Sequence, residues 1–205
     1  MHDIIDFYVP KRDEFCRGYS EYNKKEKRGS VWFEASDQIR KHWGNSNEMA
    51  KGISWLMRSW DRFYSNFDFG ELTECIKRNV DTLEGFRNRD IQSFSESDCE
   101  EISLLFDEFL NALKRSRDGA KSAVSVAKAF SVLCPHFFPL WDSYIVEHYD
   151  CWYFPETAAP RYIKFCNKMK LLAARVESFV PQPDDRPLLK RIDEYNYSKY
   201  TKAWI

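Results

Sequence analysis

The sequence contains no Cys-x-x-Cys pair, although the chain of 205 residues has six cysteines. It also lacks a Cys/His cluster at the spacing of a zinc finger, so we do not expect a structural metal. No apolar run approaches the length that a membrane span needs, and the first residues, MHDIIDFYVPKRDE, do not resemble a signal peptide. These absences predict a cytoplasmic protein with reduced thiols.

The chain also lacks an excess of charge of either sign. Its formal net charge is −1, so the composition gives no overall signature of nucleic-acid binding. A local basic face is still compatible with this charge, because affinity for phosphates depends on where the cations lie. The basic run Lys24-Lys-Glu-Lys-Arg28 is interpreted first as a solvated loop, with a phosphate-facing patch as the alternative.

No internal repeat and no alternating strand pattern of useful length occurs. The hydrophobic content of 43% and the charged content of 31% are ordinary for a folded protein. A chain of this length can form one sizeable core, or two small lobes that share it. We therefore expect an all-α fold in which residues 1–205 form a single domain.

Apolar residues at three-to-four-residue spacing predict the helices. A helix in two pieces is expected over 31–60, broken near 44–47, with Asn45 or Ser46 capping the second piece. Another begins at the capping signal of residues 95–98 and ends in a basic last turn before Gly119. The other predicted helices are 67–87, 123–133, 147–153 and 163–176, with loops at Pro155, Pro160 and 181–187 and a basic, tyrosine-rich tail over 188–205.

Aromatic residues make up 17% of the chain, with seven Trp, eleven Tyr and sixteen Phe. This is more than a helical core of this size usually needs. Large core residues are the commoner explanation of such an excess. The alternative is a protein that stacks its aromatic side chains on flat ligands.

The most informative stretch runs from Ser122 to Ile145. It begins with a helical stripe whose buried face is predicted to contain Ala123, Ala127, Phe130 and Leu133. Pro135 and Pro139 cannot extend that helix, so residues 135–141 are expected to form a tight, partly apolar loop. Asp142 follows at the place where a new helix can begin, a position that favours Asp. We expect its carboxylate to lie at the wall of the core or of a cleft.

Two lysines precede this loop. Lys121 and Lys128 are seven residues apart, and so project from roughly the same helix face. Lys128 has apolar neighbours on both sides, which can desolvate its amine, lower its pKa and make it a nucleophile. The alternative is a lysine whose methylenes lie along the core while its ammonium reaches water.

This pattern resembles a shortened form of the helix-hairpin-helix DNA glycosylase signature, over about residues 103–150. In that superfamily a hairpin leads to a helix that carries a Lys in the bifunctional members, and an apolar, proline-containing loop then leads to an invariant Asp. Here Ala123 to Lys128 matches the first part and Phe138-Pro-Leu-Trp-Asp142 the second. The usual Gly-x-Gly of the hairpin is absent. A second register matches Lys121 to the lysine, as in divergent archaeal oxoguanine glycosylases with an altered hairpin.

The resemblance implies a two-lobed helical DNA N-glycosylase that flips a modified or damaged base of double-stranded DNA into an aromatic pocket. Asp142 would be the essential carboxylate, and Lys128 or Lys121 a Schiff-base nucleophile or a phosphate contact. Neither a metal nor an organic cofactor is needed, and we expect a monomer that acts in base-excision repair or in defence against phage DNA with hypermodified bases. The candidates for substrate binding are Trp32, Trp43, Trp141, Tyr144, Tyr153, His136 and His148, and those for the DNA backbone are Ser122, Ser125 and Arg117.

Two other classes of function are compatible with the sequence. The first is a non-catalytic helical module that binds nucleic acid or protein, in which Asp142 serves only as a helix N-cap. The second is a helical RNA-cleaving toxin, which needs a paired Arg and His. Arg40-Lys-His42 is the nearest candidate, but residues two apart on a helix do not share a face. We rank this class last.

Overall fold

The structure, a computed structural model, describes residues 5–60, 66–154, 157–180 and 186–205. Within these ranges the chain folds into helices, and the β-type pairing present is an isolated bridge between Phe67 and Arg115. The all-α prediction is therefore confirmed. The α-helices are α1 (Arg12–Lys25), α2 (Ser30–Lys41), α3 (Ser46–Trp60), α4 (Phe69–Arg87), α5 (Cys99–Ala112), α6 (Ala123–Leu133), α7 (Ser143–His148), α8 (Ala158–Val176) and α9 (Leu188–Asn196).

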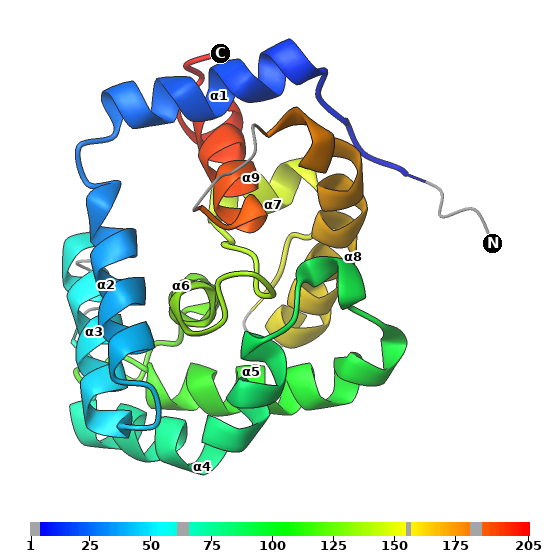
Figure 1. Cartoon of the computed structure of the whole chain (residues 1–205). Coiled ribbons are helices and arrows are strands. Elements are labelled where there is room, and N and C mark those ends of the chain that lie inside the picture. Colours follow the sequence, from blue (N-terminus) through cyan, green and yellow to red (C-terminus); the bar gives the residue numbers. More distant parts are fainter. Residues whose placement is uncertain (1–4, 61–65, 155–156, 181–185) are drawn as a thin grey trace.

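Helix α6 lies at the centre of the molecule. In Figure 1 it is seen end-on, with α2 and α3 on one side, α4 and α5 below it, α8 on the other side, and α1, α7 and α9 above. Its sequence is rich in small residues, which lets these neighbours approach closely. Nine of its eleven residues are buried, and the two that are partly exposed are Val124 and Lys128, one turn apart. The predicted apolar stripe is thus part of a helix that is buried on most sides.

The N-terminal helical pair is packed very tightly. At Gly52 of α3, an added Cβ would lie 2.7 Å from Cγ1 of Ile39 in α2, so only glycine allows this approach. The predicted break between the two helices is confirmed, with Gly44 at φ +87°. Asn45 caps α3 as one of the two predicted candidates, since its Oδ1 accepts a hydrogen bond from the Glu48 N–H at 3.2 Å.

The turn between α5 and α6 corrects one prediction. Helix α5 starts as predicted, after a capping box formed by Ser95 and Asp98. It ends at Ala112, however, so residues 114–117 are not its last turn. The segment that follows is closed by Arg115, whose guanidinium donates to both oxygens of Asp118 at 2.8 and 2.6 Å. Gly119 takes a left-handed φ of +70°, but it lies in the segment after α5 and does not end that helix as predicted.

Two further predictions around α7 and α8 are wrong. The helix expected over 147–153 ends at His148, because Asp150 takes a left-handed φ of +51° and its backbone oxygen accepts from Lys164 Nζ at 2.9 Å. Pro160 does not mark a loop but lies in the first turn of α8, where a proline removes no intrahelical hydrogen bond. The loop expected at Pro155 lies outside the described residues, as do residues 181–185 of the loop expected over 181–187.

The two ends of the chain pack against each other. Helix α1 crosses over α9, and a π-helical turn, Tyr197–Thr201, continues α9 toward the C-terminus (Figure 1). The basic run Lys24-Lys-Glu-Lys-Arg28 is not simply a solvated loop, because α1 extends through Lys25 and the Glu26 side chain is only 12% exposed. None of the helices in the described ranges is long and apolar enough to span a membrane.

Candidate functional site

A pocket of about 210 Å³ opens where the two chain ends meet the central helix. This volume is smaller than that of sites for drug-sized ligands, about 300–1,000 Å³, and suits a small ring system. Its wall is contributed by α1, α3, α6, α9, the π-helical turn and the segments beside them. The lining residues are Tyr22, Glu26, Arg28, Trp60, Lys128, Leu140, Trp141, Asp142, Asp193, Tyr197 and Thr201.

Two residues that the sequence singled out lie on this one pocket. Lys128 reaches it from the partly exposed side of α6, and Asp142 reaches it from the start of α7. The thirteen residues between them include the end of α6 and the loop of residues 135–141. That loop reverses the chain and returns the carboxylate to the same cavity as the amine.

Asp142 is the N-cap of α7, as predicted. Its Oδ1 accepts hydrogen bonds from the backbone N–H groups of Tyr144 at 2.8 Å and Ile145 at 3.2 Å. The Thr201 hydroxyl donates to the same oxygen at 3.4 Å. Oδ2 has no hydrogen-bond partner among the described residues. The carboxylate is thus fixed through one oxygen, while the other remains available to a ligand in the pocket.

Trp141 anchors the loop before Asp142. Its indole is fully buried and stacks on Tyr162 with ring centroids 5.3 Å apart and an interplanar angle of 7°. Tyr162 in turn donates to the Pro139 backbone oxygen at 3.0 Å. The Trp141 Nε1–H is buried without a hydrogen-bond partner in the described part of the chain. An unpaired buried donor of this kind costs free energy, and it lies on a residue that lines the pocket.

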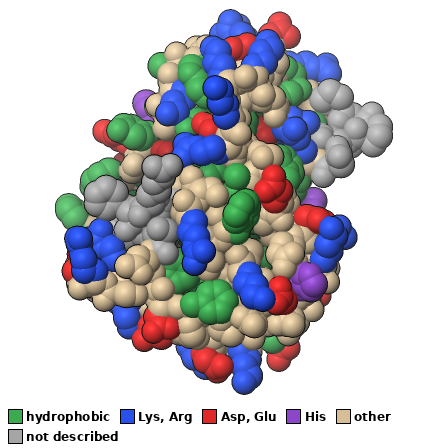
Figure 2. Space-filling view, turned by 90° about the vertical axis from the view of Figure 1, so that its left-hand side faces the viewer, with side chains coloured by type: hydrophobic (Ala, Val, Ile, Leu, Met, Phe, Trp, Pro, Cys, Tyr) green, Lys and Arg blue, Asp and Glu red, His purple; other side chains and the backbone are tan. Residues whose placement is uncertain are grey.

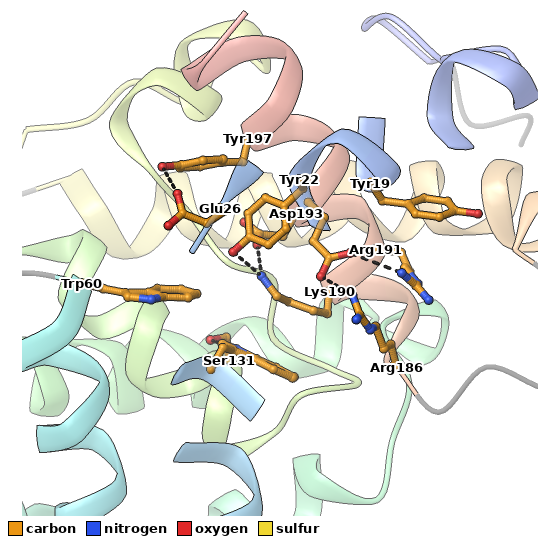
Figure 3. Close-up of polar contacts among 12 residues, drawn as sticks. Tyr19, Tyr22, Glu26, Trp60, Ser131, Arg186, Lys190, Arg191, Asp193 and Tyr197 are labelled. Atoms are coloured by element: carbon orange, nitrogen blue, oxygen red, sulfur yellow. Dashed lines mark hydrogen bonds and ion pairs between the residues drawn. The ribbon is translucent and has the colours of Figure 1, made fainter. Parts of the chain in front are cut away.

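The outer wall is held by contacts between distant parts of the chain. Tyr197 donates to Glu26 Oε2 at 3.1 Å, and Trp60 Nε1 donates to the Arg28 backbone oxygen at 3.0 Å. The Arg28 guanidinium donates to the Ser59 backbone oxygen at 3.1 Å. Figure 3 shows the rings of Trp60, Tyr22 and Tyr197 around the same space. These hydrogen bonds orient two of the three rings, Trp60 of α3 and Tyr197 of the C-terminal segment.

Behind this wall lies a buried ion pair. The side chain of Lys190 is fully buried, and its Nζ lies 2.6 Å from Asp193 Oδ2 and 3.4 Å from the Tyr22 hydroxyl (Figure 3). The ammonium also faces the rings of Tyr22, Trp60 and Trp32, with 4.7, 5.3 and 5.7 Å to their centroids. Burial favours the neutral amine, but the carboxylates of Asp193 and Glu194 outweigh it and raise the pKa of Lys190. Lys190 is therefore a cation enclosed by protein.

Burial also changes the titration of the two groups that Lys190 holds. It raises the pKa of Tyr22 to about 12, so this phenol keeps its proton at neutral pH. It raises the pKa of Asp193 as well, against the lowering effect of Lys190, and the charge of Asp142 adds to the increase. Asp142 and Asp193 both line the pocket, so the two carboxylates influence each other electrostatically.

Of the seven residues predicted to bind substrate, only Trp141 lines the pocket. Trp32 is 2% exposed and donates to Ser131 Oγ at 3.1 Å, so it is a core residue. Tyr153 packs edge-on against Trp141, behind the lining. Tyr144 and His148 lie on the surface, where His148 stacks on Tyr200. The structure therefore does not bring these four to the cavity.

Trp43 and His136, the other two, lie together in a different depression. It has a volume of about 140 Å³ and shares no lining residue with the pocket at Asp142. The Arg87 guanidinium covers the ring of Trp43 at 4.2 Å. Neither residue can therefore contact a ligand that is bound beside Asp142.

The residues predicted to contact the DNA backbone have mixed placements. Ser122 caps α6, since its Oγ accepts from the Ser125 N–H at 3.2 Å, and both serines are buried. The Ser122 side chain therefore caps the helix, and neither serine is exposed to a DNA backbone. Arg117 is 76% exposed, and Lys121 is also exposed and outside the pocket. The geometry favours Lys128 over Lys121 as the amine that accompanies Asp142.

Most of the remaining pocket residues escaped sequence reasoning. Tyr22, Asp193 and Tyr197 lie near the two ends of the chain and follow no known motif. The tyrosine-rich C-terminal tail was a weak signal for them, because a surplus of Tyr suits a site that is partly apolar and partly polar.

No protein-family model matches this chain, and the search found no match among curated proteins or solved structures. Within the described ranges, no group of three or more His, Cys, Asp or Glu residues is arranged to hold a metal ion. The function is therefore inferred from the geometry of the pocket.

Proposed function

We propose that this protein is a DNA N-glycosylase that excises a modified or damaged base, with Asp142 as its catalytic carboxylate. The observation that carries the proposal is the convergence of Lys128 and Asp142 on one small pocket with aromatic walls. The sequence resembles the helix-hairpin-helix glycosylases. The proposal therefore includes the two-lobed arrangement of helices that those enzymes have.

The chemistry suits the groups present. When the N-glycosidic bond breaks, its electron pair leaves with the base and positive charge develops on the sugar. The free Oδ2 of Asp142 would stabilise that charge, and the other oxygen is held by α7 and Thr201. Water, or the amine of Lys128, would then form the new bond to C1′ and lose a proton.

The aromatic wall supplies the means to hold a flipped base. Trp60, Tyr22 and Tyr197 replace most of the aromatic residues that the sequence suggested for this role. Stacking on such rings contributes about 1–3 kcal/mol per base, which is comparable with the cost of removing a damaged base from the duplex. The pocket thus offers a binding energy of the right size for base flipping.

Cations near the pocket can bind the DNA backbone. On the face drawn in Figure 2, Lys and Arg side chains gather toward the upper end, where α1 lies. At the end of α1, the side chains of Lys24, Lys25 and Arg28 are 67%, 44% and 55% exposed. Arg28 also lines the pocket. This position supports the phosphate-facing interpretation of the basic run.

The test is an abasic-site assay on duplexes that contain oxidised, alkylated, deaminated or phage-type hypermodified bases. We expect abasic product from the wild-type protein with at least one of these DNAs. Asp142→Asn should lower the rate by at least about 100-fold while DNA binding persists. The matched control is Asp68→Asn, since Asp68 caps α4 in the same way, with its Oδ1 3.0 Å from the Glu71 N–H, and lies outside the pocket.

Borohydride trapping distinguishes the two candidate lysines. A covalent adduct that is lost in Lys128→Ala and kept in Lys121→Ala would assign the amine to Lys128. If no DNA yields abasic sites and Asp142→Asn leaves DNA binding unchanged, the protein is not a glycosylase. The non-catalytic binding module then becomes the better explanation.

A further inference from the structure

The inner wall of the pocket presents a hydrogen-bond acceptor that the proposed bond cleavage does not use. Asp193 lines the pocket, and its side chain is 11% exposed. Oδ2 is occupied by Lys190 at 2.6 Å, whereas Oδ1 has no partner among the described residues. A carboxylate that is almost buried, with one oxygen unpaired, is costly unless a ligand supplies donors to it.

The charge state of Asp193 is set by Lys190. The lysine side chain has no exposed surface, so its ammonium requires a nearby anion. The other carboxylate close to it, Glu194, is engaged by Arg186 at 2.9 Å and Arg191 at 3.5 Å. Asp193 is therefore the anion that compensates Lys190, and an ionised carboxylate accepts hydrogen bonds but cannot donate them.

Lys190 also fixes the direction of this carboxylate. Its Nζ joins Asp193 to the hydroxyl of Tyr22, and three aromatic rings surround it. Such a packed cation cannot change its rotamer without exposing a charge to the core. The acceptor is consequently held in place before any ligand arrives, which reduces the cost of binding.

We propose that Asp193, positioned by Lys190, selects bases that present two adjacent N–H donors on one edge. This inference rests on the proposed function for the nature of the ligand, which is a nucleobase. A ring N–H beside an exocyclic amine, as in a guanine-type base, can donate to Oδ1 and to the second lone pair of Oδ2, the oxygen that also accepts from Lys190. Bases that present a carbonyl oxygen to Asp193 are rejected, because two acceptors then face each other without a proton between them.

The two carboxylates of the pocket thus have separate tasks. Asp142 is fixed at the start of α7, where its free oxygen serves the sugar, and Asp193 lies against the buried lysine, where it meets the base. The rings of Trp60 and Tyr22 lie beside Lys190 and also line the pocket, so a base stacked on them lies next to Asp193.

Calorimetric titration with 9-methylguanine and 9-methylhypoxanthine tests the inference without any need for catalysis. The two compounds differ by the exocyclic amine alone. We expect the wild-type protein to bind 9-methylguanine at least about tenfold more tightly, because a site built around a donor rejects the analogue that lacks it. Asp193→Asn should remove this preference, since an amide offers one acceptor and one donor. The matched control is Asp37→Asn. Asp37 is a surface carboxylate that pairs with Arg40 and Lys41 and lies outside the pocket.

Because Asp193→Asn leaves Lys190 without its anion, a second variant protects the test against misfolding. Lys190→Met combined with Asp193→Asn removes both charges together and should fold while showing the same loss of preference. Equal affinity of the wild-type protein for the two compounds, tighter binding of 9-methylhypoxanthine, or no binding of either would overturn the inference. Failure of the excision assay together with a clear preference for 9-methylguanine would instead refute the glycosylase proposal and leave the selectivity of the pocket standing.

Discussion

The Lys190–Asp193 pair makes a quantitative prediction about stability that does not depend on function. At 2.6 Å and an effective dielectric constant of about 20, the attraction between the two charges is about 6 kcal/mol. Desolvation of both groups offsets most of it, so the intact pair adds little net stability. Removal of one partner is different, because the remaining charge keeps its desolvation cost and loses its compensation.

We therefore expect Lys190→Met to lower the free energy of unfolding by about 3–5 kcal/mol. The loss of the ammonium from the rings of Tyr22, Trp60 and Trp32 contributes to this value, at about 0.5–2 kcal/mol per close contact. Lys190→Met combined with Asp193→Asn should recover much of the loss. The expected coupling energy between the two sites is at least about 2 kcal/mol.

Urea unfolding followed by circular dichroism at neutral pH measures these values for the wild type, the two single variants and the double variant. An unchanged m-value would show that the variants alter stability and not the extent of unfolding. A loss below about 1 kcal/mol for Lys190→Met, or additive effects in the double variant, would refute the reasoning. Either result would mean that water reaches the ammonium and that Lys190 does not fix Asp193.

The other predictions concern a helix contact, an ion pair and a helix cap. Gly52→Ala should destabilise the protein by about 1–3 kcal/mol, because its Cβ would meet Ile39 at 2.7 Å. Gly85→Ala, on the open surface of α4, should instead stabilise the protein by about 0.5–1 kcal/mol. Similar thermal shifts for the two variants would contradict the packing of α2 on α3. The Arg89 guanidinium, hydrogen-bonded to both oxygens of Asp98, holds the pKa of that carboxyl below its ordinary 3.8, so the pair adds stability above about pH 5 that is lost as the pH falls below 3.8. Asp98→Asn should consequently lower the free energy of unfolding at pH 7 and match the wild type in strong acid, and a constant difference across this range would exclude the ion pair as the cause. Asp142→Ala should cost about 1 kcal/mol in the same unfolding assay and Asp142→Asn only a few tenths, since Asn also caps a helix; equal losses would show that Asp142 does more for stability than cap α7.

The sequence predicted those features that depend on neighbouring residues. Apolar periodicity located α6, the two prolines located the loop after it, and the Asp at a helix start located Asp142. These signals are local, since a cap or a proline acts on the next few residues. The helix expected over 147–153 failed because Asp150 takes a left-handed conformation, which periodicity does not reveal.

The outer wall of the pocket depends instead on contacts between the ends of the chain. Lys190 meets Tyr22 across 168 residues and Tyr197 meets Glu26 across 171. No local sequence pattern predicts such a contact, because each partner by itself has the character of an ordinary charged or aromatic surface residue. The aromatic excess is a property of the whole chain, and of the seven residues that the sequence suggested for substrate binding only Trp141 lines the pocket. Trp32 and Trp43 precede the loop that carries Asp142, yet the rings beside that carboxylate are set by where α1 and α9 come together. A pocket built in this way joins a locally encoded carboxylate to a wall that forms only when the chain ends dock. Variants that loosen α1 from α9 should thus impair ligand binding while α6 and α7 remain folded.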